Sequence, residues 1–272
     1  MTETSHWQLQ MFQKTLKKKL RLKHLRQILG TLREDAKCLL VTCGDNNGAI
    51  NYYLRELGGE WSFADLEPDG IGEMSDLLGV DVLLARQDQI PYPDESFDWV
   101  VAIDAHEHVS RPDLFTAELY RLMKDNGRIV ITVPGGDPTR TVNRIKNWIG
   151  MTKDKYGHVR DGFSTLELNT LMQSSGLEPD RDVTFSRFFT EMIELAINFV
   201  YVKVLSPGGP EPVKAGTIAP QTRDQIQSVR KTYRMYAAVY PMFWLVSQLD
   251  RLLFFSPGYV VMVQGRKDEV PA

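Results

Sequence analysis

The chain is poor in the residues that build disulfide frameworks and metal clusters. Among its 272 residues there are only two cysteines and five histidines. Cys38 and Cys43 stand five positions apart in one apolar run. If this run is a strand, their side chains point to opposite faces of the sheet and are not easily bridged. We therefore predict two reduced thiols, as in cytosolic proteins.

Long hydrophobic runs are also missing. The longest uncharged helical stretch covers 235–249 and is interrupted by Pro241, whereas a membrane span needs about 20 residues. No apolar segment precedes the basic stretch near the N-terminus, so we expect no signal peptide. With 43% hydrophobic and 25% charged residues, the composition excludes a disordered or collagen-like chain. It predicts one large or two small globular domains.

Negative charge is absent between Thr4 and Arg33. This segment carries eight Lys and Arg residues and the whole chain has a net charge of −3, so the remaining residues carry −11. Such a segment is either the solvated face of a helix or a contact for anionic lipid, nucleic acid or an acidic substrate. Its aromatic residues, Trp7 and Phe12, stand only at its start. The interleaved aromatics typical of nucleic-acid contacts are missing, which disfavours a nucleic-acid partner.

The same segment predicts a helix over residues 5–29 with an apolar face that changes side. The first stripe steps by three and four residues and consists of Leu9, Phe12, Leu16 and Leu20. The second stripe lies on the opposite side and consists of Leu22, Leu25 and Leu29. Such a helix either bends or contacts two different partners.

From residue 37 onward, strand-length apolar runs alternate with helical stretches. The predicted strands are 37–43, 61–64, 81–84, 97–103, 128–133, 182–185 and 258–265. The predicted helices among them are 49–57, 112–124 and 165–175, the last preceded by a capping-box pattern at Ser164 and Glu167. This alternation favours a parallel sheet with helices on both faces. Two further apolar helices, 187–205 and 222–255, are joined by the Pro- and Gly-rich link 206–220.

A glycine turn and an acidic residue follow the first two predicted strands. Gly44 and Gly48 flank Asn46, and such a turn lets a ligand lie against bare backbone at a helix N-terminus. Asp65 comes about 20 residues later, where a carboxylate can accept both hydroxyls of a ribose, with Glu67 as the alternative. An ordinary strand-to-helix turn has the same pattern, so this signal is supportive only.

More specific motifs follow in order. The first motif is the run 90–98, which reads Ile-Pro-Tyr-Pro-Asp-Glu-Ser-Phe-Asp. The second follows the next predicted strand and reads Glu107-His108-Val109. The third lies at the end of the next predicted helix and reads Glu118-Leu-Tyr-Arg-Leu-Met-Lys. In these residues the chain resembles the class I S-adenosylmethionine-dependent methyltransferases, particularly the type-11-like group of small-molecule enzymes. The resemblance covers residues 37 to about 180 and the final strand.

The resemblance implies a fold and a domain organisation. The expected fold is α/β, a Rossmann-like, seven-stranded, mostly parallel sheet with helices on both faces. It is preceded by an N-terminal helix and has a helical insertion before the last strand. We divide the chain into a basic N-terminal arm (1–33), a Rossmann-like cofactor domain (34–186), a helical insertion or lid (187–256) and the final strand with its tail (257–272).

S-adenosylmethionine is the cofactor that the resemblance implies. The residues expected to bind it are Gly44, Asn46 and Gly48 at the methionine end, Asp65 and Leu66 at the ribose, Asp88 and Gln89 at the adenine, and Ile103 and Asp104 beside the methyl group. The chain departs from the family at three positions. The family usually has an acidic residue at the positions of Thr42 and Arg86, and a glycine at the position of Asn46. These departures would weaken cofactor binding and leave a degenerate, non-catalytic domain as an alternative.

Histidines supply the candidate bases. An oxygen acceptor must lose a proton, and a neutral imidazole suits that task near pH 7. His108 and His158 are equal candidates, although a lone histidine is more often structural. Tyr156 and Arg160 are the predicted substrate residues, with Arg160 as the anchor for an anionic group.

A metal site is not predicted. Asp104, Glu107 and His108 stand close together in the sequence, but no remaining set of ligands completes them.

The resemblance also implies where the helical insertion lies. In the family fold the sixth strand is parallel to its neighbours and the seventh antiparallel, so an insertion between them would lie over the active-site edge of the sheet as a lid. Its apolar composition predicts a hydrophobic or lipid-linked small-molecule acceptor, methylated at oxygen. Helices that are apolar all round either pack within protein or contact lipid. Two interpretations therefore remain: a cytoplasmic enzyme whose helices contact the inner face of an anionic membrane, or helices that pack only within the protein or across a dimer. RNA methylation through the basic arm is the remaining alternative.

Overall fold

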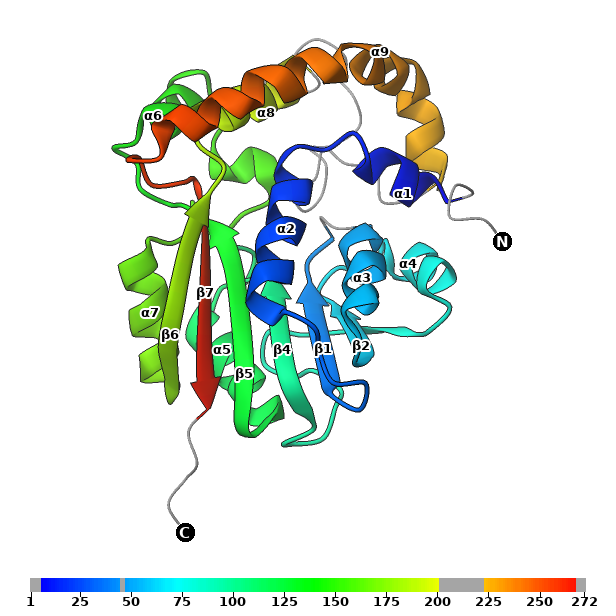
Figure 1. Cartoon of the computed structure of the whole chain (residues 1–272), viewed down its shortest axis with the longest axis vertical. Helices are drawn as coiled ribbons and strands as arrows, with labels where there is room; N and C mark the ends of the chain where they lie inside the picture. Colours follow the sequence, from blue (N-terminus) through cyan, green and yellow to red (C-terminus); the bar gives the residue numbers. More distant parts are fainter. Residues whose placement is uncertain (1–5, 45–46, 201–222, 268–272) are drawn as a thin grey trace.

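A single seven-stranded sheet forms the centre of the protein (Figure 1). The computed structural model describes residues 6–44, 47–200 and 223–267. The strands are β1 (Lys37–Thr42), β2 (Glu60–Asp65), β3 (Val82–Leu84), β4 (Phe97–Ile103), β5 (Met123–Pro134), β6 (Leu177–Phe185) and β7 (Val260–Lys267). Their order across the sheet is β3-β2-β1-β4-β5-β7-β6.

The pairing confirms the predicted mostly parallel sheet. Strands β1 to β5 pair in parallel with their neighbours, whereas β7 is inserted antiparallel between β5 and β6. The carboxyl ends of the parallel strands therefore meet at one edge. In a doubly wound sheet, this edge is where ligands bind.

Helices cover both faces of the sheet, as predicted. They are α1 (Trp7–Phe12), α2 (Lys17–Leu29), α3 (Ala49–Leu54), α4 (Ile71–Leu78), α5 (Pro112–Leu122), α6 (Thr141–Trp148), α7 (Thr165–Ser174), α8 (Phe188–Val200) and α9 (Arg223–Ser247). Short 3-10 helices cover Arg55–Leu57 (η2), Lys153–Tyr156 (η3) and Gln248–Leu253 (η6).

Alternate residues of the central strands face the two helical layers. In β1, Cys38 and Leu40 pack with α1 to α4, while Leu39 and Val41 pack with α5 and α7. This is the period of two expected for a strand buried on both faces. Both cysteines are buried and free, as predicted.

The N-terminal segment is two helices rather than the single helix predicted over 5–29. The chain leaves helical geometry after Phe12 and resumes it at Lys17. Leu9 and Phe12 pack with the α3 side of the core, whereas Leu16 joins Ile193 and Tyr240 of the helices above. Both predicted stripes therefore contribute to the same core, since Leu22, Leu25 and Leu29 pack in it with Leu9 and Phe12, and only Leu16 packs under the lid helices.

Several boundaries differ from the sequence prediction. Helices α4 and α6 were not predicted, and β5 begins at Met123 rather than at residue 128. The helix predicted over 222–255 is α9, which contains Pro241 and ends at Ser247, followed by the 3-10 helix η6. The predicted link 206–220 lies outside the described residues. The capping box at Ser164 and Glu167 is present, with each side chain bonded to the other residue's backbone N–H.

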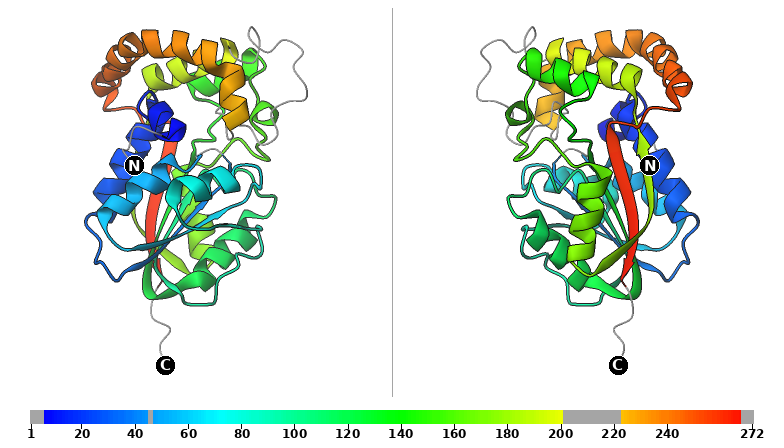
Figure 2. Two further views of the ribbon diagram at one scale, coloured as in Figure 1. Left: turned by 90° about the vertical axis from the view of Figure 1, so that its right-hand side faces the viewer. Right: turned by 90° about the vertical axis from the view of Figure 1, so that its left-hand side faces the viewer.

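Helices α8 and α9, with η6, lie across the carboxyl edge of the sheet (Figures 1 and 2). Asp250 of η6 accepts hydrogen bonds from the backbone N–H groups of Arg187, Phe189 and Thr190, at the start of α8. This carboxylate satisfies N–H groups that a helix start leaves unpaired. The described part of the insertion thus lies over this edge, and its role as a lid stays a prediction. No described helix has the length and apolarity needed to cross a membrane.

Candidate active site

The main pocket lies at the carboxyl edge of the sheet, between the sheet and the lid. Its walls come from the N-terminal helices, the loops after β4 and β5, the η3 region and α8. Among the residues that line it are Lys17, Arg21, Asp104, Glu107, His158 and Glu191. The fold thus brings the basic segment of the sequence to the predicted active-site edge.

The glycine turn after β1 is held by Asp65. One carboxylate oxygen accepts the backbone N–H groups of Gly44 and Glu67, at 2.8 Å each, and the other accepts the hydroxyl of Thr42. Burial raises the pKa of Asp65, although these hydrogen bonds oppose the shift. An acidic residue at position 42 would face this buried carboxylate with like charge, so threonine suits the position.

The structure places Gly44 and Gly48 in the turn between β1 and α3, as predicted, but it uses Asp65 differently from the prediction. The carboxylate is fully buried and engaged with the turn itself, so its contact with a ribose stays a prediction. Leu66, the next residue, is partly buried and packs on the apolar core at the α5 and α7 side of the sheet. Gly48 has a φ of 82°, and a Cβ there would come within 3.2 Å of Met74 and Leu77. Asn46 lies outside the described residues.

The predicted adenine residues lie outside the main pocket. Asp88 is exposed, and its carboxylate is 3.5 Å from Nε of Arg86. Asp88 and Gln89 both line a separate, shallow hollow. The hairpin-like bridge between Arg86 and Gln89 positions both on the surface. Their role in adenine binding remains a prediction that the main pocket itself does not support.

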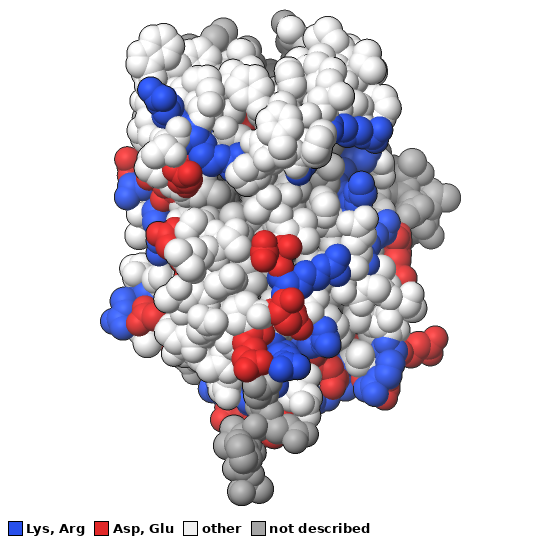
Figure 3. All heavy atoms as spheres, turned by 60° about the vertical axis from the view of Figure 1, so that its left-hand side comes forward, with Lys and Arg blue, Asp and Glu red and all other residues white. Residues whose placement is uncertain are grey.

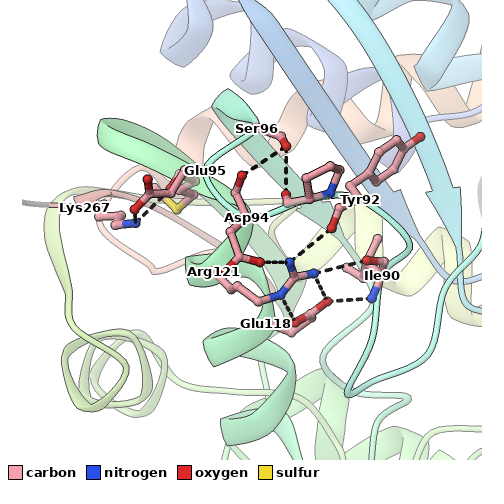
Figure 4. Close-up of polar contacts among 10 residues, drawn as sticks. Ile90, Tyr92, Asp94, Glu95, Ser96, Glu118, Arg121 and Lys267 are labelled. Atoms are coloured by element: carbon pink, nitrogen blue, oxygen red, sulfur yellow. Dashed lines mark hydrogen bonds and ion pairs between the residues drawn. The ribbon is translucent and has the colours of Figure 1, made fainter.

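The segment 90–96, which carries part of the family resemblance, is anchored by Arg121 of α5 (Figure 4). The guanidinium donates hydrogen bonds to the backbone carbonyls of Ile90 and Tyr92 and to the carboxylates of Asp94 and Glu118. Glu118 in turn accepts the Ile90 backbone N–H at 2.6 Å. These residues stabilise the loop beside the site rather than line the main pocket.

The end of β4 meets an unpredicted partner from the N-terminal segment. Arg21 is buried, its guanidinium is 2.5 Å from the carboxylate of Asp104, and its Nε donates to the Thr132 hydroxyl at 3.3 Å. Asp104 has a φ of 45°, while Ile103 before it is buried in the core. Sequence reasoning assigned Arg21 only to a charged arm, because nothing local reveals which cation turns inward.

A second unpredicted cluster joins the lid to the N-terminal helix. Glu191 of α8 is 1% exposed, and its carboxylate lies 2.8 Å from Nζ of Lys17 and 3.6 Å from Nζ of Lys146. The Ser186 hydroxyl donates to it at 2.6 Å. Burial opposes its ionisation, but the two ammonium groups prevail and lower the pKa of Glu191 to about 2. We call Lys17, Lys146 and Glu191 the lid ion cluster.

The two candidate bases face each other. The rings of His108 and His158 lie 4.7 Å apart in an edge-to-face arrangement, although the residues are 50 positions apart in the chain. Burial lowers the pKa of His158 to about 3 and also lowers that of His108. A very low pKa makes an imidazole a weak proton acceptor, which favours His108 as the base.

The other predicted residues of this region differ in placement. Tyr156 lines the pocket, but Arg160 does not: its guanidinium stacks on the Phe163 ring at 3.6 Å and donates to the Gly162 carbonyl. The structure therefore does not place Arg160 as the anchor for an anionic group. His106 is fully buried beside Thr116 and serves the core.

Comparison with known proteins defines the class. The protein-family model described as a methyltransferase domain matches residues 39–131. The chain also resembles a solved structure of geranyl diphosphate C-methyltransferase from Streptomyces coelicolor A3(2), with a TM-score of 0.56. The two chains are 12% identical, and the match covers 92% of this chain and 76% of the other. This second likeness shows the fold. Residues 39–131 therefore match a methyltransferase domain, as the motifs of this region predicted.

Two curated relatives from Mycobacterium ulcerans (strain Agy99) share this region. One is the probable phthiotriol/phenolphthiotriol dimycocerosates methyltransferase 2, 33% identical over 95 residues, 34% of this chain and 36% of the relative. The other is phthiotriol/phenolphthiotriol dimycocerosates methyltransferase 1, 31% identical over 119 residues, 41% of each chain. The alignments thus span less than half the length of these relatives.

Proposed function

We propose that the protein transfers a methyl group from S-adenosylmethionine to an oxygen of a hydrophobic or lipid-linked small molecule. The observation that carries the proposal is the pocket itself. It lies at the carboxyl edge of a methyltransferase domain and under a lid rich in apolar residues. The relatives' names, which specify dimycocerosate esters, support a hydrophobic acceptor.

The cofactor would extend from the glycine turn toward the end of β4. Gly44 and Gly48 would lie against its methionine end, and Asp65 would hold the turn and face the ribose. Arg21 supplies a buried cation beside Asp104, which suits the carboxylate of the methionine end. This arrangement would leave the methyl group directed at the space under α8.

The chemistry needs alignment more than covalent help from the protein. The acceptor oxygen attacks the methyl carbon, the carbon–sulfur bond breaks, and sulfur keeps the electron pair as S-adenosylhomocysteine forms. His108 would take the proton that the hydroxyl loses. The ether product then carries the methyl group, and no other reactant is required.

Transfer of labelled methyl from S-adenosylmethionine to total lipid extract tests this function. We expect label in the organic phase with the wild-type protein, and at least about a hundredfold less with a variant that cannot bind the cofactor. Cofactor binding without transfer to lipid, protein or RNA would instead support a degenerate domain. Label in RNA, with steeply salt-dependent binding, would favour the nucleic-acid alternative.

We further propose that the outer face of the lid rests on an anionic membrane, from which the acceptor would enter. From residue 233 to 257 the exposed charged residues with described side chains are Arg234 and Arg251, both cationic. The exposed apolar side chains of this stretch are Met235, Val239, Met242, Trp244, Leu245, Leu249, Leu252, Phe254 and Phe255. An apolar face with cations at its rim suits the interface of an anionic bilayer.

The inner and outer sides of α9 differ in the way that this contact requires. Tyr236, Tyr240 and Phe243 pack toward the protein, and the Tyr240 hydroxyl donates to the backbone of the N-terminal segment at 3.3 Å. The opposite stripe stays exposed. Figure 3 shows uncharged atoms over most of the upper end of the molecule on this face, with scattered Lys and Arg side chains. This placement would keep a cytoplasmic protein at the inner face of the membrane.

Removing the most exposed rings should weaken vesicle binding. Trp148, Phe254 and Phe255 are 86%, 79% and 74% exposed, and we expect their combined replacement by serine to reduce co-sedimentation with phosphatidylglycerol vesicles at least about tenfold. Cofactor binding should be unchanged. The matched control is Leu166→Ser. Leu166 is 75% exposed and belongs to α7, which covers the sheet and is not part of the lid. Equal sedimentation of the triple variant and the wild type would contradict the proposal.

A further inference from the structure

One wall of the pocket holds a cluster of potential metal ligands that the local sequence does not reveal. One ligand atom each from Glu107, His108 and His158 lies within 4.8 Å of the other two. Three ligands about 2.1 Å from one ion are separated by up to about 4.2 Å, so a small contraction would bring them to bonding distance. Because His158 is far from the other two in the chain, the sequence predicted no metal.

The two segments that supply these ligands are fastened together. The backbone N–H of Val159, next to His158, donates to the carbonyl of Glu107 at 2.9 Å. The backbone N–H of His158 itself donates to the carbonyl of Lys153 in η3 at 3.1 Å. The loop after β4 and the loop after η3 are thus held at fixed spacing, which preorganises the cluster.

One ring nitrogen of His108 is available as a ligand. Nε2 of His108 is buried and has no hydrogen-bond partner among the described residues. A neutral imidazole binds a metal ion through one such ring nitrogen.

The donor set indicates the kind of ion. Two imidazoles and one carboxylate bind zinc and other divalent first-row ions, whereas magnesium and calcium prefer oxygen ligands alone. Three protein ligands leave a position open for water or a substrate oxygen. Glu107 and His158 both line the pocket, so the open position would face the place that the proposed acceptor occupies.

We propose that Glu107, His108 and His158 form a binding site for a divalent transition-metal ion, Zn²⁺ or a similar ion. The proposal deepens the proposed methyl transfer and rests on it only for the role of the ion. When bound, the ion would hold the acceptor hydroxyl and stabilise its alkoxide, with the proton released to solvent. His108 would then act as a ligand in place of a general base.

Titration of the full chain with Co²⁺ tests the site, because cobalt bound by nitrogen and oxygen ligands absorbs in the visible range. We expect one equivalent to bind and Zn²⁺ to displace it. His108→Ala and His158→Ala should each weaken binding at least about a hundredfold. The control His6→Ala removes a histidine of the N-terminal segment and should bind as the wild type does.

The folding of each variant is checked by circular dichroism, and S-adenosylmethionine binding is measured on the same samples. If an alanine variant misfolds, His158→Gln keeps a polar side chain and removes the imidazole. Absent Co²⁺ absorption in the wild type, or absorption that persists in folded variants of both histidines, would overturn the metal site. Absent cofactor binding with intact Co²⁺ binding would overturn the proposed function instead and leave the metal site standing.

Discussion

Replacing Asp65 with alanine is expected to weaken S-adenosylmethionine binding at least about a hundredfold, which corresponds to ~2.7 kcal/mol. The carboxylate is buried and accepts hydrogen bonds from Thr42, Gly44 and Glu67, so its loss removes three hydrogen bonds that hold the glycine turn. Isothermal titration of the cofactor into wild-type and variant protein measures the effect. Wild-type affinity in the alanine variant would contradict the assignment.

Two further variants separate the turn from the charge. Asp65→Asn keeps a carbonyl oxygen for the backbone donors, so we expect it to fold while still binding the cofactor more weakly. Asp69→Ala removes the same charge from an exposed position of the same loop, and we expect it to bind as the wild type does. A weakening common to all three variants would point to loop charge in general rather than to Asp65.

The second large effect is expected at the lid ion cluster. Glu191→Gln leaves Lys17 and Lys146 without their buried counter-charge, and removing one partner of a buried ion pair typically costs about 3–5 kcal/mol. Chemical denaturation should show that loss in the free energy of unfolding. Glu178→Gln is the matched control, since its pair with Arg266 is exposed and should change stability by less than about 1 kcal/mol.

The same cluster predicts a dependence on pH. The pKa of Glu191 is lowered to about 2 in the folded protein, below the 4.5 of a free glutamate. The unfolded chain therefore takes up the proton first as the pH falls. The stability that Glu191 contributes is full above about pH 4.5 and is lost between that pH and about 2. In Glu191→Gln this part of the acid dependence should be missing, which denaturation at several pH values would show.

These contacts change the meaning of the basic N-terminal segment. Lys17 and Arg21 point into the protein and pair with acidic residues of the lid and of the β4 end. Tyr233, Tyr236 and Tyr240 of α9 donate hydrogen bonds to the backbone of the same segment. The arm is thus a wall of the candidate site and a support for the lid, so at least part of its charge is unavailable to an outside partner.

Local patterns predicted the framework well. The continuous apolar runs of β1 and β4, the Ser164–Glu167 capping box and the position of Asp65 at the end of β2 all depend on neighbours close in the chain. The errors have local causes too. The apolar stripe over 5–29 changes side, and the chain leaves helical geometry between Phe12 and Lys17 instead of forming one helix. Helices α4 and α6 were not recognised between the strands.

The sequence by itself determined the seven strands in their chain order, the helices α3, α5 and α7, the methyltransferase motifs and the glycine turn, because short-range periodicity and turn chemistry encode them. Only the tertiary structure decided which charged and imidazole groups meet. Arg21 reaches Asp104, Glu191 receives two lysines, and His158 joins Glu107 and His108. Such contacts join residues far apart in the chain, and their free energy depends on burial and mutual distance, which exist only once the helices and loops have packed.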